Sequence, residues 1–147
     1  MNDLINRFPL QSFDKIRYAD TDRQGHVNNA VFATFIETGR VELLYQLEQP
    51  LAGLQCAFVV VQLDLQLKGE IYWPGQVDIM GAITKIGNSS MQLHQYLFQE
   101  DRHVASARTV LVQIHEPTKR PQPLTPQARE HLQKFLREES LLPPIGR

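Results

Sequence analysis

The spacing of apolar residues predicts one long helix in the first third of the chain. Between Asn29 and about Leu47, apolar positions recur every three or four residues, as they do on one face of a helix. This stripe consists of Phe32, Phe35, Ile36, Gly39, Leu43 and Leu47. Asn28 precedes it and is a favoured N-cap residue, and Pro50 follows it. We therefore expect a helix over residues 29–47.

Apolar and polar residues alternate on both sides of this helix, which is the period of a β-strand. One short alternating segment, residues 13–18, precedes the helix. Four more follow it and are separated by turn residues; they span residues 57–68, 76–86, 91–99 and 104–115. Connections this short cannot hold a crossover helix, so the predicted sheet is antiparallel.

The end of the chain reads as a second, smaller helical unit. Several prolines follow His115, and Thr125 is a suitable N-cap for a surface helix over residues 126–139. We expect residues 141–147 to be a frayed tail.

These elements fit a single domain over residues 1–147. We divide it into an N-terminal arm (1–12), a core (13–115) and a C-terminal helix with its tail (116–147). A long antiparallel sheet with one apolar face must cover that face. The amphipathic helix 29–47 is the candidate cover, which predicts an α+β fold with a curved sheet around a central helix.

Composition excludes several classes of function. Lys and Arg number 15 against 16 Asp and Glu, so no basic excess points to a nucleic-acid partner. The single cysteine, Cys56, cannot form an intrachain disulfide and reads as a small buried hydrophobe. His94, His103 and His115 lack metal-ligand spacing, so we expect no metal site. No segment reaches the ~18 apolar residues of a membrane span, and no signal peptide is apparent. We expect a cytoplasmic protein without a membrane partner.

The segment before and into the helix carries a resemblance to a known family. It includes the run Arg17-Tyr18-Ala19-Asp20-Thr21-Asp22-Arg23-Gln24-Gly25-His26-Val27-Asn28-Asn29-Ala30, followed by Phe32-Ala33-Thr34-Phe35-Ile36-Glu37 and Arg40. This segment resembles the hotdog-fold acyl-CoA thioesterases, nearest the 4-hydroxybenzoyl-CoA thioesterase-like group. The element order over residues 13–115 is similar as well. The resemblance implies a hotdog fold, edge-to-edge pairing into homodimers or homotetramers, and acyl-CoA as substrate with no separate cofactor.

The resemblance implies catalytic roles for Asp22 and Asn29. Asp22 matches the family's catalytic carboxylate, which acts either as a nucleophile on the thioester carbonyl or as a general base for water. Asn29 matches the residue whose main-chain N–H receives the carbonyl oxygen. Unpaired N–H groups at a helix N-terminus suit a developing oxyanion.

Further site residues come from two branches of the family. The run from His26 to Asn29 also resembles the plant acyl-acyl-carrier-protein thioesterases, which place Asp, an amide residue and His at alternate loop positions. Here these are Asp22, Gln24 and His26. Glu70 stands where those enzymes carry an acidic residue, and Ile71 stands where some carry a cysteine. Another branch uses a helix glutamate, and Glu37 lies on the predicted helix. We expect Asp22, His26 and Asn29 to be catalytic, and substrate contacts from Gln24, Asn28, Glu37 and Glu70.

Each of these residues also has a purely structural interpretation. Asp22 could cap its own turn, and Asp20 is more simply structural. Asn28 is foremost a helix cap. Glu37 and Arg40 are three apart on a helix, which favours a surface ion pair.

Three functions remain open at this point. The leading hypothesis is hydrolysis of acyl-CoA to a free acid and coenzyme A. The alternatives are hydrolysis of acyl-acyl-carrier protein and binding of acyl-CoA without cleavage.

Overall fold

The computed structural model describes residues 7–45, 48 and 50–146. In chain order the elements are β1 (Leu10–Ile16), the 3-10 helix η1 (Tyr18–Asp20), α2 (Asn29–Tyr45), β2 (Cys56–Leu67), β3 (Gly75–Ile86), β4 (Ser90–Gln99), β5 (Arg102–His115), β6 (Arg120–Pro121), α3 (Pro126–Gln133) and the 3-10 helix η2 (Glu139–Leu141). The helix and the four strands predicted after it are confirmed.

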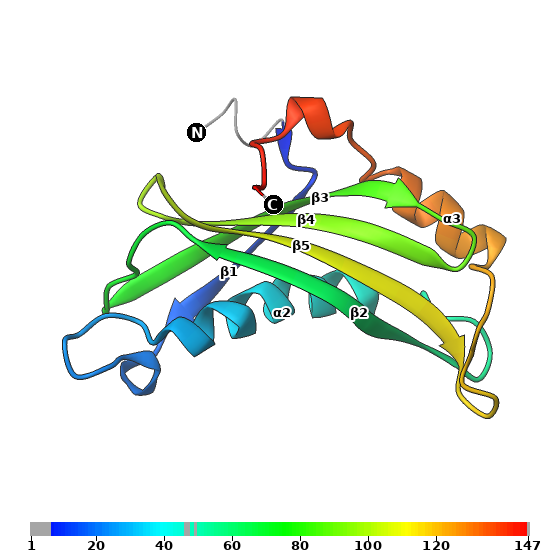
Figure 1. Ribbon diagram of the computed structural model, residues 1–147, viewed down its shortest axis with the longest axis horizontal. Helices are drawn as coiled ribbons and strands as arrows, with labels where there is room; N and C mark the ends of the chain where they lie inside the picture. Colours follow the sequence, from blue (N-terminus) through cyan, green and yellow to red (C-terminus); the bar gives the residue numbers. More distant parts are fainter. Residues whose placement is uncertain (1–6, 46–47, 49, 147) are drawn as a thin grey trace.

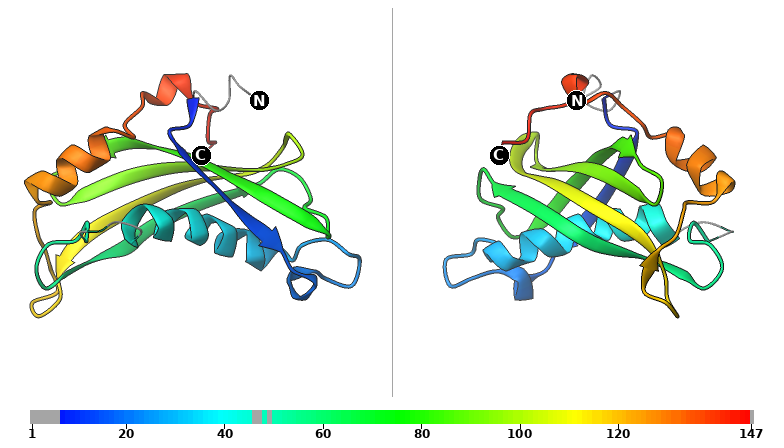
Figure 2. Two further views of the ribbon diagram at one scale, coloured as in Figure 1. Left: turned by 180° about the vertical axis from the view of Figure 1, so that it is seen from behind. Right: turned by 45° about the vertical axis from the view of Figure 1, so that its right-hand side comes forward.

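The strands form one curved sheet that wraps around α2. Neighbouring strands run antiparallel in the order β1-β3-β4-β5-β2, and β6 extends the sheet beside β5. Figure 1 and both views of Figure 2 show α2 across the concave face of the sheet and α3 at its rim. The predicted α+β fold, an antiparallel sheet around a central helix, is confirmed.

Helix α2 packs on the sheet through the apolar stripe that its sequence predicts. Its buried residues are Phe32, Phe35, Ile36, Leu43 and Leu44. Gly39 allows α2 to lie close to the sheet, because a Cβ there would lie 2.7 Å from the Ile79 side chain of β3. The sixth predicted stripe residue, Leu47, lies outside the described residues.

Asn28 caps the N-terminus of α2, as predicted. Its side-chain Oδ1 accepts a hydrogen bond from Ala30 N–H at 3.1 Å, and its main-chain oxygen accepts one from Val31 N–H at 2.9 Å. The cap fixes where the loop ends and the helix begins.

Strands β2 and β3 follow one another in the chain but do not pair. They are separated in the sheet by β4 and β5, so residues 68–74 pass across the end of the β4–β5 hairpin. Early in this crossing, Lys68 and Gly69 both donate main-chain hydrogen bonds to the Val104 oxygen of β5. The crossing carries Glu70 to the loop before α2.

The first strand begins and ends earlier in the chain than predicted. Strand β1 begins at Leu10, so the predicted irregular arm 1–12 is wrong in its last residues. Leu10 pairs with Gly81 of β3, a long-range pairing that is absent from the local pattern. The strand ends at Ile16, and Tyr18 lies in η1 because Asp20 turns the chain by accepting a hydrogen bond from Arg17 N–H at 2.8 Å.

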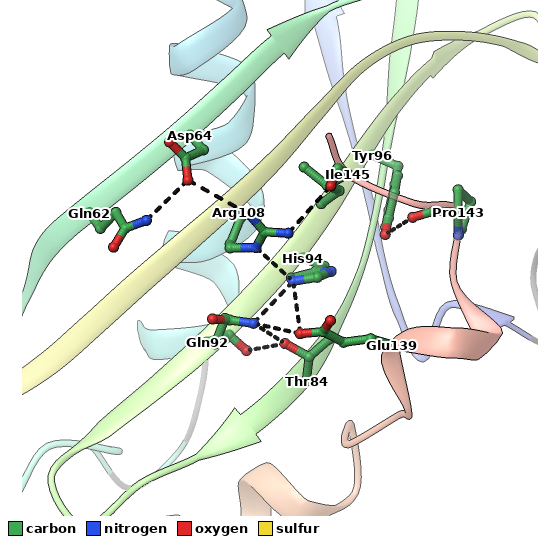
Figure 3. Close-up of polar contacts among 10 residues, drawn as sticks. All are labelled: Gln62, Asp64, Thr84, Gln92, His94, Tyr96, Arg108, Glu139, Pro143 and Ile145. Carbon is green, nitrogen blue, oxygen red and sulfur yellow. Dashed lines mark hydrogen bonds and ion pairs between the residues drawn. The ribbon is translucent and has the colours of Figure 1, made fainter. Parts of the chain in front are cut away.

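The C-terminal segment also differs from the prediction. Helix α3 ends at Gln133 rather than at 139, because the chain leaves it to form main-chain hydrogen bonds with Ile83 of β3. The tail does not fray within its described part. Leu142 is buried on the outer face of the sheet, and the Tyr96 hydroxyl donates to the Pro143 oxygen at 2.7 Å (Figure 3).

Within the described ranges, no helix combines the length and the apolar character that crossing a membrane requires.

Candidate active site

Asp22 shapes the loop that leads into α2. One carboxylate oxygen, Oδ1, accepts main-chain hydrogen bonds from Gln24 at 2.8 Å and from His26 at 3.2 Å. The Asp22 N–H in turn donates to the His26 oxygen at 2.7 Å. The turn-capping role is therefore present. The second oxygen, Oδ2, has no donor among the described residues, and the residue is exposed, so this oxygen is free to meet a substrate.

Asp20 has the structural role expected of it. Its side chain is buried and pairs with the Arg17 guanidinium at 2.8 Å, and its main-chain oxygen accepts from Asn28 N–H at 2.8 Å. The hydrogen bond and the charge of Asp20 raise the pKa of Arg17. Asp20 thus ties the end of β1 to the helix cap.

The structure brings His26 and Glu70 together. His26 Nδ1 lies 3.2 Å from Glu70 Oε1, and the imidazole and the Tyr72 ring pack in a T-shaped arrangement, with ring centroids 5.0 Å apart. A ring nitrogen beside a carboxylate carries the proton, so this contact favours the Nδ1–H form of neutral His26. Its Nε2 then keeps a lone pair that can accept a proton or a hydrogen bond.

Tyr72 completes this cluster, and the sequence did not single out its hydroxyl. The hydroxyl donates to the second carboxylate oxygen of Glu70, Oε2, at 2.9 Å. This hydrogen bond and the charge of Glu70 raise the pKa of Tyr72. Tyr72 stands two residues after Glu70 on an extended segment, so the spacing that puts both side chains on one face was the available signal.

Asn29 presents the main-chain N–H that the resemblance assigns to the carbonyl oxygen. It is the first residue of α2, and its N–H has no acceptor among the described residues. The next two N–H groups, of Ala30 and Val31, are both taken up by Asn28. A free N–H at the positive end of a helix is suited to an oxyanion.

The other three predicted site residues, Gln24, Asn28 and Glu37, are exposed and make only local contacts among the described residues. Gln24 and Asn28 are exposed on the same loop, and each makes a contact that shapes it. Glu37 lies on the exposed face of α2, where its carboxylate is 3.8 Å from the Arg40 guanidinium. This is the ion pair that the sequence favoured, and within the described chain it does not join the His26–Glu70 cluster. Burial lowers the pKa of Arg40, although the charge of Glu37 acts in the opposite direction.

No group of three or more His, Cys, Asp or Glu side chains in the described ranges is arranged to hold a metal ion.

Comparison with known proteins places this loop and fold in one family. The model of the thioesterase-like superfamily matches residues 16–135. The acyl-CoA thioester hydrolase YbgC of Escherichia coli is 26% identical over 122 residues, which cover 81% of this chain and 88% of that protein.

Solved structures share the same fold. A predicted thioesterase from Bacillus stearothermophilus superimposes with a TM-score of 0.76 at 22% identity, covering 88% of this chain and 97% of that one. A thioesterase from Thermus thermophilus, solved with coenzyme A and zinc, gives a TM-score of 0.75 at 26% identity, covering 87% and 94%. With a family model matched along most of its length, the chain belongs to the thioesterase-like superfamily.

Proposed function

We propose that this chain hydrolyses acyl-CoA thioesters to a free carboxylic acid and coenzyme A. The observation that carries the proposal is that, among the described residues, Asp22 in the loop before α2 keeps one carboxylate oxygen without a donor and Asn29 at the start of α2 keeps its N–H without an acceptor. In thioester hydrolysis a carboxylate can serve as general base or nucleophile, and a main-chain N–H can stabilise the oxyanion. The similarity to a protein named acyl-CoA thioester hydrolase supports coenzyme A as the thiol half of the substrate.

The thioester carbonyl would accept a hydrogen bond from Asn29 N–H at the start of α2. One such donor contributes on the order of 3 kcal/mol in acyl-transfer enzymes, because negative charge grows on the oxygen in the transition state. The dipole of α2 acts in the same direction. Gln24 and Asn28, exposed beside this position, would contact the substrate near the thioester.

Asp22 would supply the attack on the carbonyl carbon. As a general base, Oδ2 takes a proton from water while the water oxygen bonds to the carbon; the C–S bond then breaks and the thiolate takes up a proton. As a nucleophile, Oδ2 itself bonds to the carbon, the C–S bond breaks, and the coenzyme A thiolate leaves and takes up a proton. Water then hydrolyses the resulting mixed anhydride to the free acid and the Asp22 carboxylate. In both routes His26, held by Glu70, would offer Nε2 to the water molecule.

The test is the release of free thiol from short, long and aromatic acyl-CoA thioesters by the native chain and by Asp22→Asn. Asparagine keeps an oxygen for the two loop N–H groups, so the fold should persist. We expect kcat/KM to fall a hundredfold or more, about 3 kcal/mol of barrier.

Asp64→Asn is the matched control, since Asp64 is a partly exposed acid on β2 whose contacts are with Arg108 and Gln62. It should retain activity. If Asp22→Asn keeps the native activity, another residue is the catalytic group. If the native chain hydrolyses no CoA thioester, the proposal is refuted.

Acyl-acyl-carrier protein is the second candidate substrate. The observation in its favour is that Asp22, His26 and Glu70, which match positions in the plant carrier-protein enzymes, lie on adjoining segments. Assays with acyl groups on coenzyme A and on carrier protein separate the two. A tightly bound thioester that is never cleaved would instead indicate a binding domain.

We also propose that the chain works as a homodimer or homotetramer in the cytoplasm. Strand β2 lies at an edge of the sheet and exposes four large apolar side chains, Val60, Val61, Leu63 and Leu67. An apolar edge strand is a ready template for pairing with a second copy. Val61→Lys should shift the chain toward monomer in light scattering. Phe13→Lys, on the opposite edge strand β1, is the control that should leave the assembly unchanged.

A further inference from the structure

Residues 68–74, which connect β2 to β3, form the crossing segment. The side chain of Gln99, the last residue of β4, binds the main chain of this segment at Tyr72. Its Oε1 accepts from Tyr72 N–H at 2.9 Å, and its Nε2 donates to the Tyr72 oxygen at 2.7 Å. Gln99 is buried, with 5% of its surface exposed. The amide thus takes the place that a neighbouring strand would have, and it satisfies both polar groups of one residue.

Arg102, the first residue of β5, fixes the same segment from a second direction. One guanidinium nitrogen, Nη2, donates to Gln99 Oε1 at 3.0 Å, and the other, Nη1, donates to the main-chain oxygen of Glu70 at 3.2 Å. The guanidinium carbon lies 5.4 Å from the centroid of the Tyr72 ring, within the range of a cation–π contact.

The far side of the crossing segment faces the catalytic loop. Val27 N–H donates to the Ile71 oxygen at 2.8 Å, and His26 and Tyr72 form a β-bridge. The segment is therefore held between two partners. The β4–β5 hairpin end holds it through Gln99 and Arg102, and the loop that carries Asp22 and His26 closes over it.

We propose that Gln99 and Arg102 are positioning residues for the His26–Glu70 pair. Neither contacts His26 directly. Their hydrogen bonds to the main chain of Glu70 and Tyr72 fix the position and orientation of residues 70–72. This places the Glu70 carboxylate against His26 Nδ1. The proposal rests on the proposed function, in which His26 Nε2 faces the water molecule.

The experiment compares Gln99→Ala with Gln113→Ala. Gln113 is a matched control at the other end of β5, because its buried amide likewise braces main chain, accepting from Gly53 N–H and donating to the oxygens of Gln122 and Pro123. Both variants lose a buried brace and should lose thermal stability. Only Gln99→Ala should disturb His26.

Two measurements report whether His26 is still correctly positioned in each variant. The first is the tautomer of neutral His26, read from the ring ¹⁵N shifts of histidine-labelled protein and assigned with His26→Gln. We expect the Nδ1–H form in the native chain and in Gln113→Ala, and a shift toward the Nε2–H form in Gln99→Ala. The second is kcat with an acyl-CoA, which we expect to fall roughly tenfold to a hundredfold in Gln99→Ala while KM changes little.

Conservative variants should have intermediate effects on the His26 tautomer and on kcat. Gln99→Glu keeps the acceptor for Tyr72 N–H and Arg102 but loses the donor to the Tyr72 oxygen, and Arg102→Lys keeps the charge but loses the two-pronged contact. Both should fall between the native chain and Gln99→Ala in each readout.

The proposal is overturned if Gln99→Ala loses stability as Gln113→Ala does but keeps the native His26 tautomer and the native kcat. If the native chain hydrolyses no thioester, the proposed function fails. The tautomer comparison still decides the positioning role in that case.

Discussion

His26 Nδ1 lies 3.2 Å from Glu70 Oε1, although one residue belongs to the loop before α2 and the other to the crossing between β2 and β3. The same carboxylate accepts the Tyr72 hydroxyl through its other oxygen. Glu70 therefore joins the two segments and orients the imidazole.

His26 and Glu70 should act as one unit in catalysis. We expect His26→Gln and Glu70→Gln each to lower kcat/KM by about tenfold to a hundredfold, because the water molecule loses a group that positions it. The double variant should be little worse than either single one, because residues of one unit are non-additive. A double-mutant cycle on purified proteins measures this. Effects that simply add would show that the contact has no catalytic consequence.

Tyr72 should titrate above an ordinary tyrosine. The hydrogen bond to Glu70 and the charge of Glu70 both favour the protonated phenol, so the pKa of Tyr72 is raised. A raised folded-state pKa stabilises the fold below the unfolded value, about 10, and that contribution is lost as the pH rises through the folded value. Glu70→Gln should lower the pKa of Tyr72, read as the phenolate absorbance that Tyr72→Phe removes. An unchanged titration curve would contradict the contact.

Asn28 should contribute to stability through its cap. Asn28→Ala removes the acceptor for Ala30 N–H and should cost about 1 kcal/mol of unfolding free energy, whereas Asn28→Asp should retain most of it. Denaturant unfolding measures the difference. Asn29→Ala is the adjacent control, since the proposed role of Asn29 uses its main-chain N–H; it should leave stability and hydrolysis nearly unchanged. Loss of hydrolysis in Asn29→Ala would instead assign a role to the side chain.

His94 should make the stability of the fold pH-dependent. It is buried under the C-terminal segment, where Arg108 Nε donates to its Nε2 at 3.4 Å and Glu139 lies 3.7 Å away (Figure 3). Because arginine remains protonated, this contact requires neutral His94. Burial lowers the pKa of His94 most, Glu139 opposes the shift, and Arg108 adds to it.

The sign of this effect follows from the lowered pKa. The contribution is present above the unfolded value, about pH 6.5, and is lost as the pH falls through the lower folded value. Melting temperatures between pH 5 and pH 8 should therefore drop more on acidification in the native chain than in His94→Gln. Equal drops in both proteins would show that His94 does not carry the dependence.

The sequence by itself determined the parts of this protein that local periodicity and local capping control. The stripe from Phe32 to Leu43, the Asn28 cap and the four alternating segments after residue 55 are each written within a few neighbouring positions. The loop motif around Asp22 is equally local, so its resemblance to thioesterases could be read directly. The site roles inferred from that resemblance remain proposals.

Only the tertiary structure decided which distant segments meet. It separated β2 from β3, turned the C-terminal tail onto Tyr96, ended α3 against Ile83, and carried Glu70 to His26. These contacts depend on strand order and on main-chain groups that must find partners far along the chain. The periodicity of a segment records which face it buries but not against what, and so Tyr72, Gln99 and Arg102 became visible as partners only in the folded chain.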